Sequence, residues 1–146
     1  MDSPFDLSYE GVGLKGMGKE PVKGEVLLWK GPISFLGDVD PDRGILTKDG
    51  IQMDIHDKVL IFTEGAGSTV GSYVVYNLRL NNKAPRAMVM LKADAIISIG
   101  CILADIPLVH KVPPELWKEA STGDTAVVDS AAGRVGIWKR DGKKQG

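Results

Sequence analysis

Short apolar runs separated by turn-forming residues make up most of the chain. Runs rich in valine, isoleucine and leucine predict strands at residues 24–30, 45–47, 59–62, 87–91, 108–109, 125–129 and 134–138. Residues 59–62 are continuously apolar, as expected for a strand covered on both faces. The last two strands are joined through residues 130–133 and are expected to form a closing hairpin.

A helical period replaces the strand pattern in three places. Val70, Val74, Val75 and Leu78 recur at three- and four-residue steps, which predicts a helix that stops at residues 81–85. We expect further helices at residues 94–104 and 113–120, the second with proline in its first turn. Residues 31–37 are expected to be a glycine-bounded loop or short strand, and residues 38–44 a turn.

These elements predict one compact mixed α/β domain, with β-rich termini around a βαβα centre. Its expected extent is residues 23–138. Residues 1–22 carry several glycines and few apolar side chains, which favours a flexible or surface segment. Residues 139–146 are expected to be a solvated charged tail.

The segment between the strand at 59–62 and the following helix is the candidate functional element. Gly65, Gly67 and Gly71 are interleaved with the hydroxyl-bearing residues Ser68 and Thr69, and Ser72 follows. A strand, a glycine loop and a helix start together expose backbone N–H groups and the positive end of a helix dipole, which favour an anion. Two interpretations stay open at this point: Ser68 caps the helix, or it takes part in chemistry.

Better-known motifs do not fit this loop. A Walker A loop needs a lysine that is missing here, and the last glycine falls one residue late for a dinucleotide fingerprint. A catalytic triad would need His56 or His110 as its base, and neither has a supporting signature. The carboxylates of residues 38–42 lie beside Pro41 and Gly44, so we interpret them as a solvated turn.

Composition narrows the class of protein. The 146 residues are 43% hydrophobic and 25% charged, enough for a buried core. The net charge of -1 argues against a dedicated nucleic-acid binder. With one cysteine, no membrane-length apolar run and no signal-peptide pattern at the acidic N-terminus, the chain is expected to be cytoplasmic.

The same composition provides few side chains of the kinds that usually bind a metal. Cys101, His56 and His110 show no paired ligand spacing, so we expect no metal or cofactor on this chain. Cys101 lies in an apolar helix pattern and is expected to be a small buried hydrophobe.

Residues 25–137 resemble the small subunit of the aconitase X family. Two of the shared pieces, Ile-Ser-Phe-Leu-Gly and Gly-Ser-Thr-Val-Gly-Ser-Tyr, are together quite specific. In chain order the shared pieces are residues 24–27, 33–37, Asp40 with 44–45, 67–74, 84–85, 93–96, 106–109 and 122–124. The resemblance implies the aconitase-like swivelling β/β/α domain.

The resemblance also implies roles for particular residues. The catalytic base of the family corresponds to Ser68, and Gly67, Thr69, Gly71 and Ser72 would line the substrate site. Ser34 and Phe35 lie in the other family-specific loop and would face the same cleft. A large subunit would carry a [4Fe-4S] cluster, which would explain the single cysteine of this chain.

The activity implied by the family is dehydration of (R)-5-phosphomevalonate to trans-anhydromevalonate 5-phosphate, a step toward isoprenoids. Dehydration of a hydroxyproline-type substrate, as in bacterial relatives, is one alternative. A non-catalytic binding or regulatory module is another. Two departures from the family pattern bear on the choice: Ala66 replaces a usual lysine or arginine, and Asp38 replaces a usual glycine. A cation beside Ser68 would help to hold an anionic substrate or lower the pKa of the serine.

Overall fold

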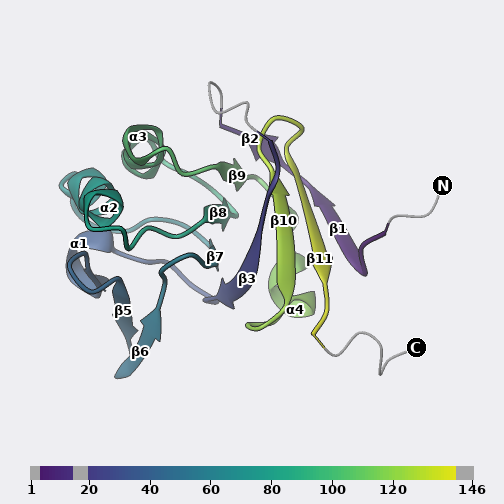
Figure 1. The fold of residues 1–146 in the computed structure, drawn as a ribbon, viewed down its shortest axis with the longest axis horizontal. Helices are drawn as coiled ribbons and strands as arrows, with labels where there is room; N and C mark the ends of the chain where they lie inside the picture. The colour runs from purple at the N-terminus through teal and green to yellow at the C-terminus, as the bar shows by residue number, and fades with distance from the viewer. Residues whose placement is uncertain (1–3, 15–19, 141–146) are drawn as a thin grey trace.

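The computed structural model of the chain describes residues 4–14 and 20–140. Its strands are β1 (Leu7–Glu10), β2 (Val12–Gly13), β3 (Val22–Leu28), β4 (Val39–Asp40), β5 (Ile45–Lys48), β6 (Ile51–Asp54), β7 (Val59–Phe62), β8 (Ala87–Met90), β9 (Leu108–His110), β10 (Thr125–Asp129) and β11 (Arg134–Trp138). Its helices are α1 (Phe35–Asp38), α2 (Gly71–Leu80), α3 (Ala95–Ala104) and α4 (Leu116–Glu119). Figure 1 shows this mixed α/β arrangement, which confirms the expected fold class.

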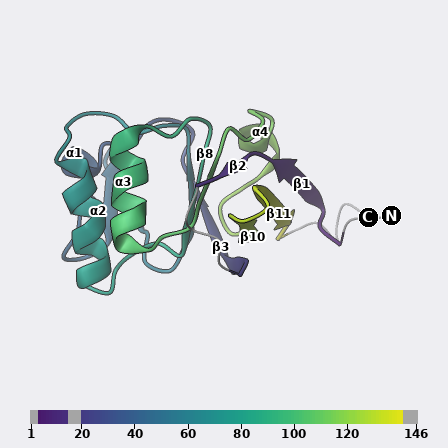
Figure 2. The same ribbon diagram turned by 90° about the horizontal axis from the view of Figure 1, so that it is seen from above.

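In the described ranges, one sheet has eight strands in the order β1-β11-β10-β3-β7-β8-β9-β2, and β4, β5 and β6 form a second sheet. The neighbours β3, β7, β8 and β9 run parallel. α2 and α3 lie side by side on one side of these strands, and β10, β11 and α4 lie on the other (Figure 2). Within the described part of the chain, no helix combines the length and apolar character needed to cross a membrane.

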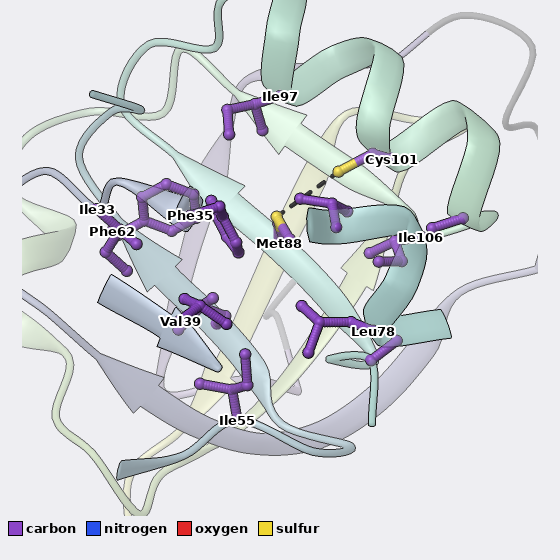
Figure 3. Packing of buried hydrophobic residues seen from close by; sticks show 14 of the residues in the cluster. Ile33, Phe35, Val39, Ile55, Phe62, Leu78, Met88, Ile97, Cys101 and Ile106 are labelled. Atoms are coloured by element: carbon purple, nitrogen blue, oxygen red, sulfur yellow. Dashed lines mark hydrogen bonds between the residues drawn. The ribbon is translucent and has the colours of Figure 1, made fainter. Parts of the chain in front are cut away.

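The parallel strands are buried on both faces because alternate side chains enter two separate cores. Leu60 and Phe62 join the core beneath α2 and α3, whereas Val59 and Ile61 join the core on the β10–β11 side. This confirms the prediction of a doubly covered strand at 59–62. Figure 3 shows the first core, in which the Cys101 thiol donates to Met88 Sδ at 3.6 Å. Burial raises the pKa of Cys101 to about 12, as expected for a thiol that acts as a hydrophobe.

Residues 7–13 connect the two ends of the main sheet. β1 pairs with β11 at one end of the strand order, and β2 pairs with β9 at the other end. The Gly11 N–H donates to the Gly133 carbonyl at 2.7 Å, and a Cβ on Gly13 would collide with the Ser130 carbonyl. The short segment therefore closes the curled sheet into a near-barrel.

Within residues 1–22, expected to be a flexible or surface segment, residues 7–13 form the paired strands β1 and β2. Tyr9 is only 7% exposed and its hydroxyl donates to the Glu119 carboxylate. The order of this segment comes from strands distant in sequence, so its own composition does not reveal it. Residues 1–3 and 15–19 lie outside the described ranges.

Two elements differ from the local pattern. Residues 31–37 were expected to be a loop or short strand, but the short helix α1 begins within them, at Phe35. The strand β6 was not expected. Its signal is the two-residue turn Asp49–Gly50, where both φ angles are positive (52° and 77°) as in a type I′ hairpin.

The start of the expected charged tail is anchored. Lys139 Nζ lies 2.8 Å from Asp124 Oδ2, and the Arg140 N–H donates to Asp124 Oδ1 at 2.9 Å. Burial alone would raise the pKa of Asp124, but hydrogen bonds from Lys139, Arg140 and Ser121 hold that pKa below its ordinary value. The first two residues of the expected charged tail are therefore held against the domain, and residues 141–146 lie outside the described ranges.

Candidate active site

Three loops meet at the carboxyl ends of the parallel strands β3, β7 and β8. The first two are tied together by backbone hydrogen bonds: the Ile33 N–H donates to the Glu64 carbonyl at 3.0 Å, and the Ala66 N–H donates to the Ile33 carbonyl at 3.1 Å. The third is tied to the second, because the Leu91 N–H donates to the Thr63 carbonyl at 3.0 Å. Ligands of open α/β sheets bind at this end of the strands.

Glycines allow these loops to approach one another closely. Gly67 has a φ of +91°, and a Cβ added there would lie 2.8 Å from Ser34 Oγ. A Cβ on Gly65 would lie 2.8 Å from Asp94 Oδ2. A side chain at Gly65 would displace the Asp94 and Ile97 side chains, and one at Gly67 would displace the Ser34 side chain and strain the backbone.

Ser68 lies at the centre of this arrangement and is half-buried. Its Oγ accepts a hydrogen bond from the Val70 N–H at 3.1 Å, and its carbonyl accepts one from the Gly71 N–H at 3.0 Å. The serine thus satisfies a backbone donor at the start of α2, and its oxygen receives the field of that N–H group. It borders a small hollow of about 80 Å³, lined by Phe35, Gly65, Ala66, Gly67, Ser68, Gly71, Asp94, Ile96 and Ile97.

The Ser34 loop is held by reciprocal capping of α1. Ser34 Oγ accepts from the Gly37 N–H at 3.2 Å, while the Ser34 N–H donates to Asp38 Oδ2 at 2.8 Å. Lys48 Nζ of β5 lies 3.2 Å from the same carboxylate oxygen. Asp38, one of the two departures from the family pattern, therefore fixes the backbone of the residue that touches Gly67.

Of the remaining predicted residues, Phe35 and Gly71 border the hollow. Phe35 is 1% exposed and packs edge-on against Phe62, with ring centroids 5.9 Å apart, so it also belongs to the core. Thr69 is exposed and does not line the hollow. Ser72 is buried where α2 meets α3, and its hydroxyl donates to the Thr69 carbonyl at 3.2 Å.

Asp94 is the residue that sequence reasoning placed only as a helix start. Its Oδ1 accepts from the Ile97 N–H at 2.8 Å, so it does cap α3. Its other oxygen faces the glycine loop at Gly65. An acidic residue four positions after a buried parallel strand could have been assigned to this end of the sheet from sequence.

The histidines do not form a triad with Ser68 in the described hydrogen-bond network. His56 precedes β7 and lies beside Asp57, with 3.6 Å between Nε2 and Oδ2, at the opposite end of that strand from Ser68. His110 Nδ1 accepts from the Ala93 N–H at 3.4 Å. Burial, and then the charge of Lys111, lower the pKa of His110, which favours its neutral form.

The described residues offer few groups that could bind a metal ion. No cluster of three or more histidine, cysteine, aspartate or glutamate side chains placed to hold a metal ion occurs among the described residues. Asp40 Oδ1 accepts from the Asp42 and Arg43 N–H groups at 2.9 and 3.3 Å, so residues 41–44 form the expected turn. The expected turn is wrong for Asp38, which ends α1, and for Asp40, which lies in β4. The buried thiol of Cys101 is also a poor source of a thiolate ligand.

Comparison with known proteins identifies the relatives of this fold. The family model described as the aconitase X swivel domain matches residues 14–137. A protein of Methanococcoides burtonii named phosphomevalonate dehydratase small subunit is 42% identical over 121 residues, covering 81% of this chain and 88% of the relative. A Thermococcus kodakarensis protein of the same name is 45% identical over 118 residues, covering 79% and 86%.

Solved structures agree with the sequence relatives. The crystal structure of Thermococcus kodakaraensis aconitase X in its holo-form matches with a TM-score of 0.82 and 39% identity, covering 91% of this chain and 99% of that chain. A solution structure of a UPF0107 protein matches with a TM-score of 0.81 and 35% identity, covering 91% and 100%. Sequence and fold thus lead to the same assignment: the chain belongs to the aconitase X swivel-domain family.

Proposed function

We propose that this chain is the small subunit of a hydro-lyase that dehydrates (R)-5-phosphomevalonate to trans-anhydromevalonate 5-phosphate, with Ser68 as the base. The observation that carries the proposal is the position of Ser68 on a glycine loop at a helix start, at the carboxyl ends of parallel strands. The two relatives described above bear the name of a phosphomevalonate dehydratase small subunit and are matched over most of their length.

The hollow beside Ser68 is too small to be a complete site. Its volume of about 80 Å³ falls well below the roughly 300–1,000 Å³ of ordinary ligand pockets. The lining has Ala66 where a basic side chain could have held an anion. A partner must therefore supply the remaining walls and most of the grip on substrate. The name "small subunit" borne by the relatives implies a large subunit as that partner.

We expect an iron–sulfur cluster on the large subunit, because the residues of this chain do not fit one. Cluster binding needs several thiolates, whereas Cys101 is the one cysteine and it lies in the core. A cluster on the partner would supply Lewis acidity toward the leaving hydroxyl group. We place the working complex in the cytoplasm, where free cysteines stay reduced.

The contribution of this chain is the removal of a proton. Dehydration breaks a C–H bond next to the substrate carboxylate, its electron pair forms the C=C bond, and hydroxide leaves from the neighbouring carbon. Ser68 Oγ would accept the proton as an alkoxide. That charge is stabilised by the Val70 N–H at 3.1 Å and by the positive end of α2, provided that docking excludes water.

The test is anaerobic co-expression with a candidate large subunit, followed by assay of 5-phosphomevalonate dehydration. We expect Ser68→Ala to lower kcat by about 10²–10⁴-fold, the usual contribution of a general base. Thr47→Ala, which removes an exposed hydroxyl on β5, is the control and should keep full activity. Full activity of Ser68→Ala would refute its role as base.

A substrate panel separates the alternatives. Turnover of hydroxyprolines in place of 5-phosphomevalonate would identify the other dehydratase of the family. A stable complex with no activity on any of these substrates would favour a binding or regulatory module, which the absence of a cation at Ala66 would then explain.

A further inference from the structure

The outer face of α3 is apolar although nothing in the described chain covers it. The helix has no charged residue between Asp94 and Asp105. Its inner side is buried through Ile97, Gly100, Cys101 and Ala104. The opposite side carries Ile99, Ile102 and Leu103, which are 50%, 52% and 52% exposed. A helix that is apolar all round is normally buried on all sides.

The neighbouring helix α2 continues this surface. Tyr73, Tyr76 and Leu80, spaced three and four residues apart, are 63%, 36% and 60% exposed. The two helices pack closely, since a Cβ on Gly100 would lie 3.0 Å from the Val75 Cβ. On both helices these exposed side chains lie on the side opposite the buried residues, which are Val74, Val75 and Leu78 on α2 and Ile97, Cys101 and Ala104 on α3. We call this surface the helix-layer face: Tyr73, Tyr76, Leu80, Ile99, Ile102 and Leu103.

Exposed apolar side chains are concentrated here rather than scattered. Among the described residues, ten large apolar side chains are exposed, and eight of them lie on α1, α2, α3 or the residue that precedes α2. Arg79 is the one charged residue of α2, and its guanidinium donates to the Ala104 and Asp105 carbonyls at 2.7 and 3.4 Å, near the far end of α3. Contiguous apolar patches of this kind mark interaction surfaces.

Exposed apolar side chains also lie close in sequence to the candidate active site. Val70, 44% exposed, lies two residues after Ser68, and Leu36, 51% exposed, lies two residues after Ser34. Ile96, one helical turn before Ile99 and Gly100, lines the hollow itself. A body that closes the hollow would therefore lie next to these apolar side chains.

We propose that the helix-layer face is the docking surface for the large subunit, through an apolar patch on that subunit next to its half of the active site. The inference rests on the proposed function, because that function requires a partner that completes the hollow at Ser68. A second copy of this chain would bring no group of metal ligands from its described residues, whereas the proposed function needs a partner that carries an iron–sulfur cluster. The large subunit is therefore the occupant.

Ile102→Glu tests the proposal and Ile51→Glu is its matched control. Ile51 lies on β6 and is 55% exposed, against 52% for Ile102, so both changes place a new carboxylate at an equally exposed isoleucine. Each full-length chain is co-expressed anaerobically with the tagged large subunit, and affinity is measured by titration of the purified chains. Thermal melts of the small chains alone establish that each variant is folded.

We expect Ile51→Glu to bind as wild type and Ile102→Glu to bind at least tenfold more weakly, with Ile102→Leu close to wild type. Hydrogen exchange of α3 should slow in the wild-type complex. Binding of Ile102→Glu within twofold of wild type would overturn the proposal. So would self-association of the small chain that Ile102→Glu abolishes while binding to the large subunit persists.

The two proposals fail in different ways. A wild-type complex that is disrupted by Ile102→Glu but dehydrates no substrate supports this interface and refutes the proposed function. An active complex that Ile102→Glu leaves intact supports the proposed function and refutes this interface.

Discussion

At the residue scale, the loop around Ser68 depends on one unusual backbone conformation. Gly67 has a φ of +91° and lies against Ser34 Oγ. Residues other than glycine rarely adopt a backbone conformation with such a φ angle. The position of Ser68 therefore depends on its neighbour having no side chain.

We predict that Gly67→Ala destabilises the chain by about 1–3 kcal/mol, the usual cost of a strained backbone, and lowers the activity of the complex more than tenfold. The new Cβ would lie 2.8 Å from Ser34 Oγ and displace the hydroxyl that caps α1. Urea denaturation of the small chain and the dehydration assay of the complex measure the two effects.

Gly50→Ala is the matched control for this change. Gly50 also has a positive φ, +77°, but a Cβ there would meet nothing within 4 Å. Gly50→Ala should therefore lose only the stability that backbone strain costs, and the complex that contains it should keep its dehydration activity. Equal effects of the two substitutions on activity would mean that the contact with Ser34 is irrelevant to the site.

How much of the site could be predicted differs from residue to residue. The glycine spacing and helix pattern were sufficient to place a candidate loop at Gly65–Ser72. They left the role of Ser68 open between cap and base, and the structure shows that its oxygen does cap a backbone N–H. Ser34 was reached through family resemblance alone. The place of Asp94 at this end of the sheet could have been predicted from its position after β8, but its approach to Gly65 is a tertiary contact that the sequence pattern does not show.

At the element scale, local pattern succeeded where burial is strong. The doubly buried strands β7 and β8, the helices α2 and α3 and the hairpin β10–β11 occur where they were expected. The pattern failed for β6, in which Met53 alone is partly buried, because an exposed hairpin has no apolar period to detect. It failed for β1 and β2 because their partners lie far away in the chain.

The contact between α2 and α3 leads to a prediction at this scale. Gly100→Leu should lower the free energy of unfolding by about 1–3 kcal/mol, as overpacking does in well-packed cores. A Cβ at that position already lies 3.0 Å from Val75 Cβ and 3.3 Å from the Ser72 backbone. Chemical denaturation of the isolated chain provides the measurement.

Ala95→Leu adds a similar side chain to the exposed start of the same helix and serves as the control. It should change stability by less than about 0.5 kcal/mol. Because leucine has a better helix propensity than glycine by up to about 1 kcal/mol, a stabilised Gly100→Leu would show that the two helices are free to separate.

At the scale of the whole molecule, β1 is a structural strand. Tyr9 pairs with Val135 of β11, is 7% exposed and belongs to the core on the β10–β11 side. Its hydroxyl donates to the carboxylate of Glu119, the last residue of α4. Burial and this hydrogen bond raise the pKa of Tyr9, so the phenol stays protonated and able to donate.

We predict that Tyr9→Ala costs about 3–5 kcal/mol, as for other large-to-small changes at buried aromatic residues. Tyr9→Phe should cost only about 1 kcal/mol, because it removes a single hydrogen bond. Tyr73→Ala makes the same truncation on the helix-layer face, where Tyr73 is 63% exposed, and should have little effect on the isolated chain. Similar losses for Tyr9→Ala and Tyr73→Ala would mean that β1 is dispensable.

Closure of the sheet by residues 7–13 also constrains how the protein can be made. Residues 7–10 emerge early from the ribosome, but their partners are residues 134–137. At about 5–20 residues per second, they wait on the order of ten seconds for that partner strand. Until β11 is translated, β10 presents an unpaired edge of the kind that recruits other chains. Among the described strands, one of the first to be synthesised is thus one of the last to find its place, and a nascent chain truncated before residue 134 would be a substrate for chaperones.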